Sequence, residues 1–204
     1  MLSATVSLKI DKAAIRRKLE RAVAHSPAIK RLAYKKAYGI FSHAKRMMLR
    51  EFDRHPVTQE ILEGPRALNL TGTLDGYGNL FSFIGFEAGT KPTEILRELL
   101  ELGTAIRPTV FRNHAWYFRV RIPSRDAIAE ATPMPWERGN SWAFGIETFI
   151  SGLSHYMYKK WYGKESRSGM GLQLPYENLE DAAFTSHPYM TEILRNFRMR
   201  VNQK

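Results

Sequence analysis

The chain lacks cysteine entirely among its 204 residues. This absence excludes disulfide bonds, thiol nucleophiles and zinc sites built on cysteine. Long apolar runs are missing too: no stretch approaches the roughly 18–20 residues that cross a bilayer, so we expect no membrane segment. The first ten residues, MLSATVSLKI, have neither the charged head nor the apolar core of a signal peptide. These absences are typical of a protein that is made and assembled in a cytosol.

Acidic residues are scarce in the first quarter of the chain. Residues 1–50 contain 13 lysines and arginines but only two acids, Asp11 and Glu20. Their net charge of +11 equals that of the whole chain, so residues 51–204 sum to zero. A net charge concentrated in one segment indicates what the protein binds rather than how it folds. It predicts that this segment meets nucleic acid, an anionic membrane or an acidic protein surface.

Helical periodicity dominates the same basic segment. Asp11 is a plausible N-cap for a helix ending near His25, and Pro27 begins a second helix that continues from Ala28 to about Asp53. The second helix has an apolar stripe that we expect to pack in the core: Ile29, Ala33, Ala37, Ile40, Ala44 and Met47. On or near its opposite side lie Arg31, Lys35, Arg46 and Arg50. We predict that these four basic residues bind a partner.

Residues 66–92 contain five glycines between runs that favour β-strands, such as Asn79–Phe86. Asp75-Gly76 is typical of a tight turn, and we expect Gly76 to adopt a positive φ. The glycine spacing does not match a nucleotide-binding fingerprint. This segment therefore predicts a hairpin or a looped pair of strands.

The rest of the chain alternates helical, extended and loop-like patterns. Alternating apolar side chains predict one strand over Thr109–Ile122, and an earlier short strand over Val6–Ile10. The other predicted elements are helices over 94–102, 124–131, 141–161 and 188–201, and an extended arm over 163–181. Aromatic residues are dense after Pro133, and among them Trp136 and Trp142 are candidates for contact with a partner.

No catalytic constellation stands out. The six histidines are scattered without metal-ligand spacing, and no Gly-x-Ser-x-Gly elbow occurs. Among the acids only Glu87 and Glu147 have a suggestive context, and a structural role explains each more simply. A metal-dependent nuclease built from distant carboxylates has no motif to support it. We therefore expect a protein that is not an enzyme and that carries no cofactor or metal.

In order, the chain has basic helices, a Thr71-Gly72-Thr73-Leu74 segment, a glycine-rich region with Phe86-Glu87-Ala88-Gly89-Thr90, and a further strand. Over roughly residues 12–122 this resembles the neck or tail-completion family of long-tailed bacteriophages. Members are similar in having N-terminal helices, a Thr-Gly-x-Leu turn into a sheet and an aromatic-x-x-Gly-Thr step. An additional Gly-rich loop at Asp75–Gly78 and the small Ala88 before Gly-Thr depart from that pattern.

The resemblance implies an α+β fold, with N-terminal helices packed on a mainly antiparallel sheet and with further C-terminal helices and an arm. It implies a neck-like domain over residues 1–132, and we expect residues 133–204 to pack on it as a helical extension. It further implies a structural virion protein that forms a homo-oligomeric ring at the head–tail junction. Its partners there would be the head-closure and tail-terminator proteins, and DNA passing through the ring.

The alternative is a nucleic-acid-binding protein that uses the basic helices of residues 12–50. Their lysines and arginines would neutralise phosphates, and Tyr34 and Tyr38 lie along the same helix.

Overall fold

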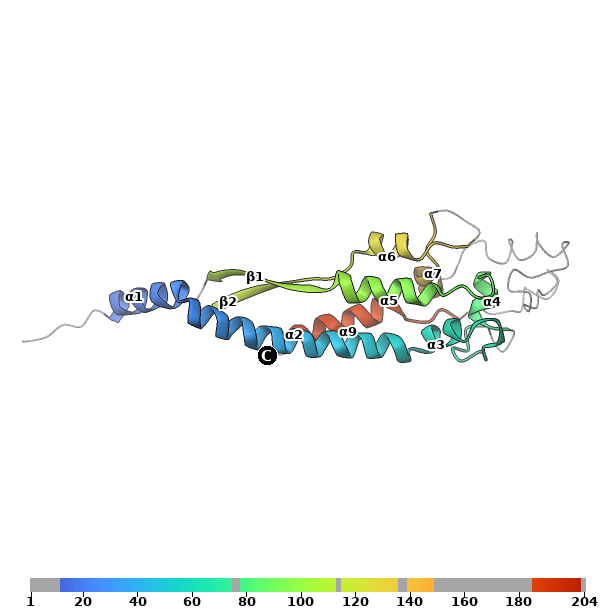
Figure 1. The fold of residues 1–204 in the computed structure, drawn as a ribbon, viewed down its shortest axis with the longest axis horizontal. Helices are drawn as coiled ribbons and strands as arrows, with labels where there is room; N and C mark the ends of the chain where they lie inside the picture. The colour runs from blue at the N-terminus through green and yellow to red at the C-terminus, as the bar shows by residue number, and fades with distance from the viewer. Residues whose placement is uncertain (1–11, 75–77, 113–114, 136–138, 149–184, 203–204) are drawn as a thin grey trace, which may run out of the picture. The chain divides into compact units, whose positions relative to one another are not determined.

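A computed structural model describes residues 12–74, 78–112, 115–135, 139–148 and 185–202. The predicted strand at Val6–Ile10, the turn at Asp75-Gly76 and the arm over 163–181 lie outside these residues. The fold is α+β, with helices at both ends of the chain and a small antiparallel sheet (Figure 1). The prediction of this fold class is confirmed.

The chain forms two compact units. The smaller unit comprises residues 1–41 and 106–120, and the larger unit comprises residues 42–105 and 121–204. A segment from the middle of the chain thus joins the N-terminal helices, so the division follows packing rather than chain order. It does not coincide with the boundary expected after residue 132.

Two helices and a two-stranded sheet build the smaller unit. They are α1 (Lys12–His25), the first half of α2 (Pro27–Arg54), β1 (Ala105–Arg112) and β2 (Ala115–Arg121). Both helices were predicted, and Pro27 begins the second one as expected. The single strand predicted over Thr109–Ile122 was wrong, because β1 ends and β2 begins inside it. Alternation identified the second strand correctly, whereas the break between the two strands has no glycine or proline to mark it.

The second half of α2 supplies a wall of the larger unit's core. Its buried side chains are Ala44, Met48 and Phe52, and the Phe52 ring lies 6.0 Å from that of Tyr189. Ion pairs join this half of the helix to α5 (Pro92–Gly103) and α9 (Met190–Asn202). The predicted apolar stripe was wrong at its N-terminal end, because Ile29 and Ile40 remain 40% and 42% exposed. An apolar stripe is buried only where another element covers it.

Polar pairs hold α2 to these two helices. Asp53 accepts a hydrogen bond from the Arg97 guanidinium of α5 at 2.8 Å. Glu51 accepts hydrogen bonds from Asn196 and Arg200 of α9. Both carboxylates close to the end of α2 are therefore engaged within the larger unit.

The glycine-rich segment is folded differently from the prediction. Residues 80–84 form the short helix α4 (Leu80–Ile84), not a strand. Asn79 caps it by accepting a hydrogen bond from the Ser82 amide at 2.9 Å, and Gly85 ends it with a φ of +84°. An apolar run this short fits a strand or a helix equally well, and here the cap and the terminal glycine decide.

A buried carboxylate organises the same region. Glu60 lies in α3 (Pro56–Leu62), which is followed by the 3₁₀ turn η1 (Gly64–Arg66), and its side chain is fully buried. One of its oxygens accepts from the amide and hydroxyl of Thr71 at 3.0 and 2.9 Å, and the other accepts from the amide of Leu80 at 2.7 Å. Glu60 therefore fixes both ends of residues 71–80 to one helix.

Two shorter helices also belong to the larger unit. The helix predicted over 124–131 is observed as α6 (Arg125–Ala131), and Ser124 caps it by accepting a hydrogen bond from the Ala127 amide. The helix predicted to begin near Ser141 is observed as α7 (Trp142–Thr148), and its predicted continuation lies outside the described residues. Helix α5, predicted over 94–102, begins two residues earlier at Pro92, which agrees with the preference of proline for the first helical turn.

We expect Glu60→Gln to lower the free energy of unfolding by about 2 to 4 kcal/mol. The amide nitrogen that replaces one carboxylate oxygen cannot accept a hydrogen bond from Thr71 or Leu80, which leaves buried donors unpaired. Urea denaturation followed by circular dichroism measures the change. Glu63→Gln, which alters an exposed side chain three residues later, is the matched control. Equal stability of the two variants would contradict the role of Glu60.

Candidate partner-binding surface

The net charge of the chain collects on the smaller unit. Its residues contain 13 basic and 2 acidic side chains, a net charge of +11, whereas the larger unit has 18 of each. All described lysines and arginines of the smaller unit are exposed, and we call them the basic surface: Lys12, Arg16, Arg17, Lys18, Arg21, Lys30, Arg31, Lys35, Lys36, Arg107, Arg112 and Arg119.

Three members of the basic surface were missed by the sequence analysis. Arg107, Arg112 and Arg119 lie on the hairpin β1–β2, about seventy residues or more beyond the helices that they join. Their position in sequence places them in the region of zero net charge. The alternation of Arg119 with Phe118 and Val120 shows which side of the strand it occupies. It does not show that this strand packs with the N-terminal helices.

Aromatic contacts attach the hairpin to α2. The Phe118 ring lies 6.1 Å from that of Tyr34, and the Trp116 ring packs 5.2 Å from that of Phe111 within the hairpin. The Lys30 ammonium lies 5.8 Å from the centre of the Trp116 ring. These side chains cover the face of the hairpin that meets α2, so the residues that alternate with them on β2 point away from the helix.

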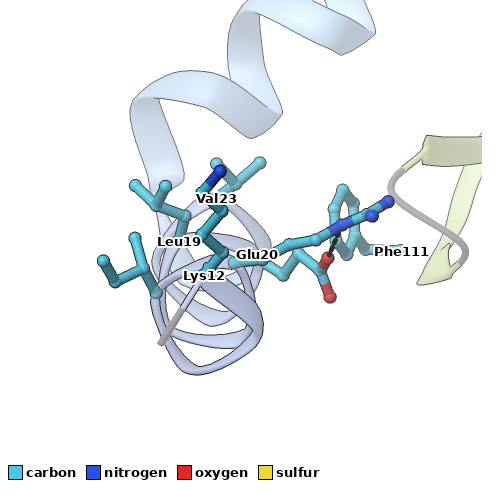
Figure 2. A pocket seen from close by; sticks show the side chains of 7 residues that line it. Lys12, Leu19, Glu20, Val23 and Phe111 are labelled. Atoms are coloured by element: carbon cyan, nitrogen blue, oxygen red, sulfur yellow. Dashed lines mark hydrogen bonds and ion pairs between the residues drawn. The ribbon is translucent and has the colours of Figure 1, made fainter. Parts of the chain in front are cut away.

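An open groove of about 520 Å³ lies between α1 and the hairpin (Figure 2). Its floor is apolar, formed by Ile15, Leu19 and Val23 of α1 and by Phe111 of β1. Ile15 and Leu19 are 49% and 60% exposed and stand one helical turn apart. Lys12 and the ion pair between Arg16 and Glu20 complete the lining. The described residues of the smaller unit therefore present an exposed apolar strip bordered by positive charge.

The structure distributes the predicted partner-binding residues over both units. Arg31 and Lys35 belong to the smaller unit, and Arg46 and Arg50 belong to the larger one; all four side chains are exposed. Trp142 is only 1% exposed and packs against Phe86 and Tyr189, so it serves the core. Trp136 lies outside the described residues.

In the described part of the larger unit, two histidines and a tyrosine lie close together. The rings of His55 and His187 lie 5.4 Å apart, and the Tyr189 ring is 4.8 Å from that of His55. Burial, and next the neighbouring His187, lower the pKa of His55, although Glu192, the Pro188 backbone and Glu51 act in the opposite direction. Burial raises the pKa of Tyr189, whose hydroxyl is paired with Thr58 at 2.9 Å. Two imidazoles and a buried phenol form a packed cluster, without a nucleophile poised beside a base.

Glu147, one of the two acids singled out in the sequence, also has a structural partner. Its carboxylate accepts hydrogen bonds from the amides of Tyr189 and Thr191 at 3.1 and 2.6 Å, at the start of α9. A carboxylate at a helix N-terminus satisfies amides that the helix leaves unpaired.

Among the described residues, no group of three or more histidines and acids is arranged to hold a metal ion. No helix in that part of the chain is long and apolar enough to cross a membrane. In comparisons with known proteins, no family model, curated protein or solved structure matches this chain.

The lowered pKa of His55 predicts a loss of stability in acid. The unfolded chain, with its ordinary histidine pKa of about 6.5, binds the proton more readily than the folded chain. The contribution of His55 to stability is therefore fully present above the histidine pKa of the unfolded chain, and the free energy of unfolding decreases as the pH drops below that value. His55→Asn retains an acceptor for the Val57 amide, which His55 caps at 3.3 Å, but does not titrate.

We expect this variant to lose less stability than the wild type between about pH 7 and pH 5, measured as the shift in urea midpoint. His43→Asn, at an exposed position of α2, is the control. If His55→Asn and the wild type lose the same amount, another group is responsible for the pH dependence.

Proposed function

We propose that this chain is a structural subunit of a bacteriophage neck, a tail-completion protein that forms a homo-oligomeric ring at the head–tail junction. Head-closure and tail-terminator proteins are its proposed neighbours. The proposal begins with the sequence resemblance, whose Thr71–Leu74 and Phe86–Thr90 segments both lie in the larger unit. In this chain the Thr-Gly-x-Leu segment leads into α4 rather than into a strand, so the support comes from the motifs and the N-terminal helices.

The observation that carries the proposal is the exposed apolar strip of α1. Isolated exposed leucines are ordinary on protein surfaces, but contiguous apolar side chains lining a groove mark a site of association. Ile15, Leu19, Val23 and Phe111 meet that description. An assembly subunit is expected to have such a surface, because another subunit or a neighbouring ring covers it.

The basic surface supports the same proposal. A single exposed ion pair contributes less than about 1 kcal/mol, but charges clustered on one unit set orientation and partner choice. The larger unit, with no net charge, has no comparable bias. We therefore assign the contacts with neighbouring rings, or with DNA between them, to the smaller unit and to the adjoining exposed residues of α2.

Replacing Arg31, Lys35, Arg46 and Arg50 together with Glu is expected to abolish incorporation into tailed particles. Reversed charges would repel an acidic neighbour. The helical circular dichroism should be retained, since all four side chains are exposed. The control reverses the same number of exposed arginines in the larger unit: Arg66, Arg125, Arg195 and Arg198. Particle assembly is scored by electron microscopy after complementation, and wild-type assembly by the α2 variant would refute this role.

The double variant Ile15→Ser and Leu19→Ser tests the apolar strip. We expect it to reduce the oligomer mass measured by light scattering while leaving the unfolding midpoint nearly unchanged, because these side chains are exposed within a single chain. Leu68→Ser with Leu102→Ser, at two exposed positions of the larger unit, is the matched control. An unchanged oligomer in the α1 variant would show that the strip is not a subunit contact.

A further inference from the structure

The outward face of the hairpin carries side chains that the sequence resemblance does not use. The guanidinium carbon of Arg112 lies 4.5 Å from the centre of the Tyr117 ring. Arg119 follows Tyr117 by two residues on β2, so both point to the same side of the strand, and both are exposed. The opposite side of β2, with Trp116 and Phe118, faces α2. Arg112, Tyr117 and Arg119 thus lie on the outward face of a hairpin whose opposite face packs against a helix.

Little on the smaller unit offsets these arginines. Among its described residues the only acid is Glu20, which already pairs with Arg16 at 3.2 Å. Twelve exposed cations therefore surround the hairpin face or lie on the helices beside it. A partner that neutralises them has to bring many negative charges distributed over three elements.

We propose that this face, formed by Arg112, Tyr117 and Arg119, binds the sugar–phosphate backbone of DNA. The arginines would contact phosphates, and the Tyr117 ring would stack on an exposed base or sugar. The inference rests on the proposed function, because a subunit of a neck ring would lie beside the DNA that passes through the ring. Binding itself does not require assembly and can be measured on the free protein.

DNA fits this surface better than an acidic protein does. A duplex presents one negative charge for about every 1.7 Å of its axis, so cations on α1, α2 and the hairpin can all be neutralised by one continuous ligand. The combination of exposed arginine with an aromatic ring is also what backbone-tracking nucleic-acid sites use. A carboxylate patch would satisfy the charge but, unlike a base, could not stack on an aromatic ring.

The experiment measures fluorescence anisotropy of labelled DNA with the full chain, at several salt concentrations between about 50 and 200 mM. The probes are a duplex of about 30 base pairs and a single strand of the same length. Arg112→Gln with Arg119→Gln removes two charges, and Arg66→Gln with Arg198→Gln in the larger unit is the matched control. Polyglutamate at equal charge concentration serves as the competitor that represents an acidic protein.

We expect the wild type to bind with strong salt dependence. The hairpin variant should decrease the magnitude of the slope of log K against log salt by about 2, close to one for each arginine, whereas the control should leave it unchanged. Tyr117→Leu should weaken single-strand binding by about tenfold with little change in slope. Wild-type protein without salt-dependent binding would overturn the proposal. Equal slopes for the hairpin variant and the wild type would overturn it as well, as would polyglutamate that displaces DNA as effectively as unlabelled DNA does.

Thermal melts by circular dichroism establish that the variants are folded. If the glutamine pair lowers the melting temperature, Arg112→Glu and Arg119→Glu are measured singly, and either one should lower the slope. Light scattering on the same wild-type sample separates the two proposals. A monomer that binds DNA through the hairpin contradicts the ring and supports this inference, and an oligomer that ignores DNA does the reverse.

Discussion

Helix α2 runs without a break from Pro27 to Arg54, and both compact units are built on it. Its two halves meet different requirements. The C-terminal half buries Ala44, Met48 and Phe52 and directs Glu51 and Asp53 to arginines of α9 and α5. Along the N-terminal half the hairpin packs on one side, and Ile29 and Ile40 remain exposed beside lysines and arginines. One helix thus passes from a packed core to a largely exposed surface.

The distribution of acids explains why the charge separates so completely. In the larger unit carboxylates are used to build the fold: Glu60 holds Thr71 and Leu80, Glu147 caps α9, and Asp53 and Glu51 bind helices to α2. Each is matched by a donor within the same unit. The smaller unit uses aromatic packing instead, through Tyr34, Phe111, Trp116 and Phe118. Among its described residues Glu20 is the one acid, and it pairs with Arg16, so the exposed cations far outnumber the acids and repel one another until an anion arrives.

The sequence predicted the helices well because their signals are local. Pro27, the Ser124 cap and the apolar positions Ile193, Leu194 and Phe197 of α9 each act within one or two turns. The strands predicted over Asn79–Phe86 were wrong. Two interactions decide the conformation there: the cap made by Asn79, the first residue of the run, and the hydrogen bond to Glu60, which lies outside the run.

The basic helices of the site were evident from composition alone. The hairpin arginines were missed because their membership in the smaller unit depends on contacts between Phe118 and Tyr34, 84 positions apart, which periodicity cannot reveal.

On the smaller unit, the apolar strip favours self-association, whereas the positive charge disfavours it. Burying the strip at Ile15 and Leu19 against another copy would be favourable by about 25 cal/mol for each Å² of apolar surface removed from water. The same contact would bring two units of charge +11 together. Repulsion of this kind is weakened by salt over a distance of about 10 Å at 0.1 M, and it is cancelled outright by a bound polyanion. In the proposed ring, DNA bound to the hairpin face would therefore neutralise the positive charge of the smaller units. This would remove the electrostatic cost of packing the α1 strips of neighbouring copies against each other, so DNA binding and ring assembly would reinforce each other.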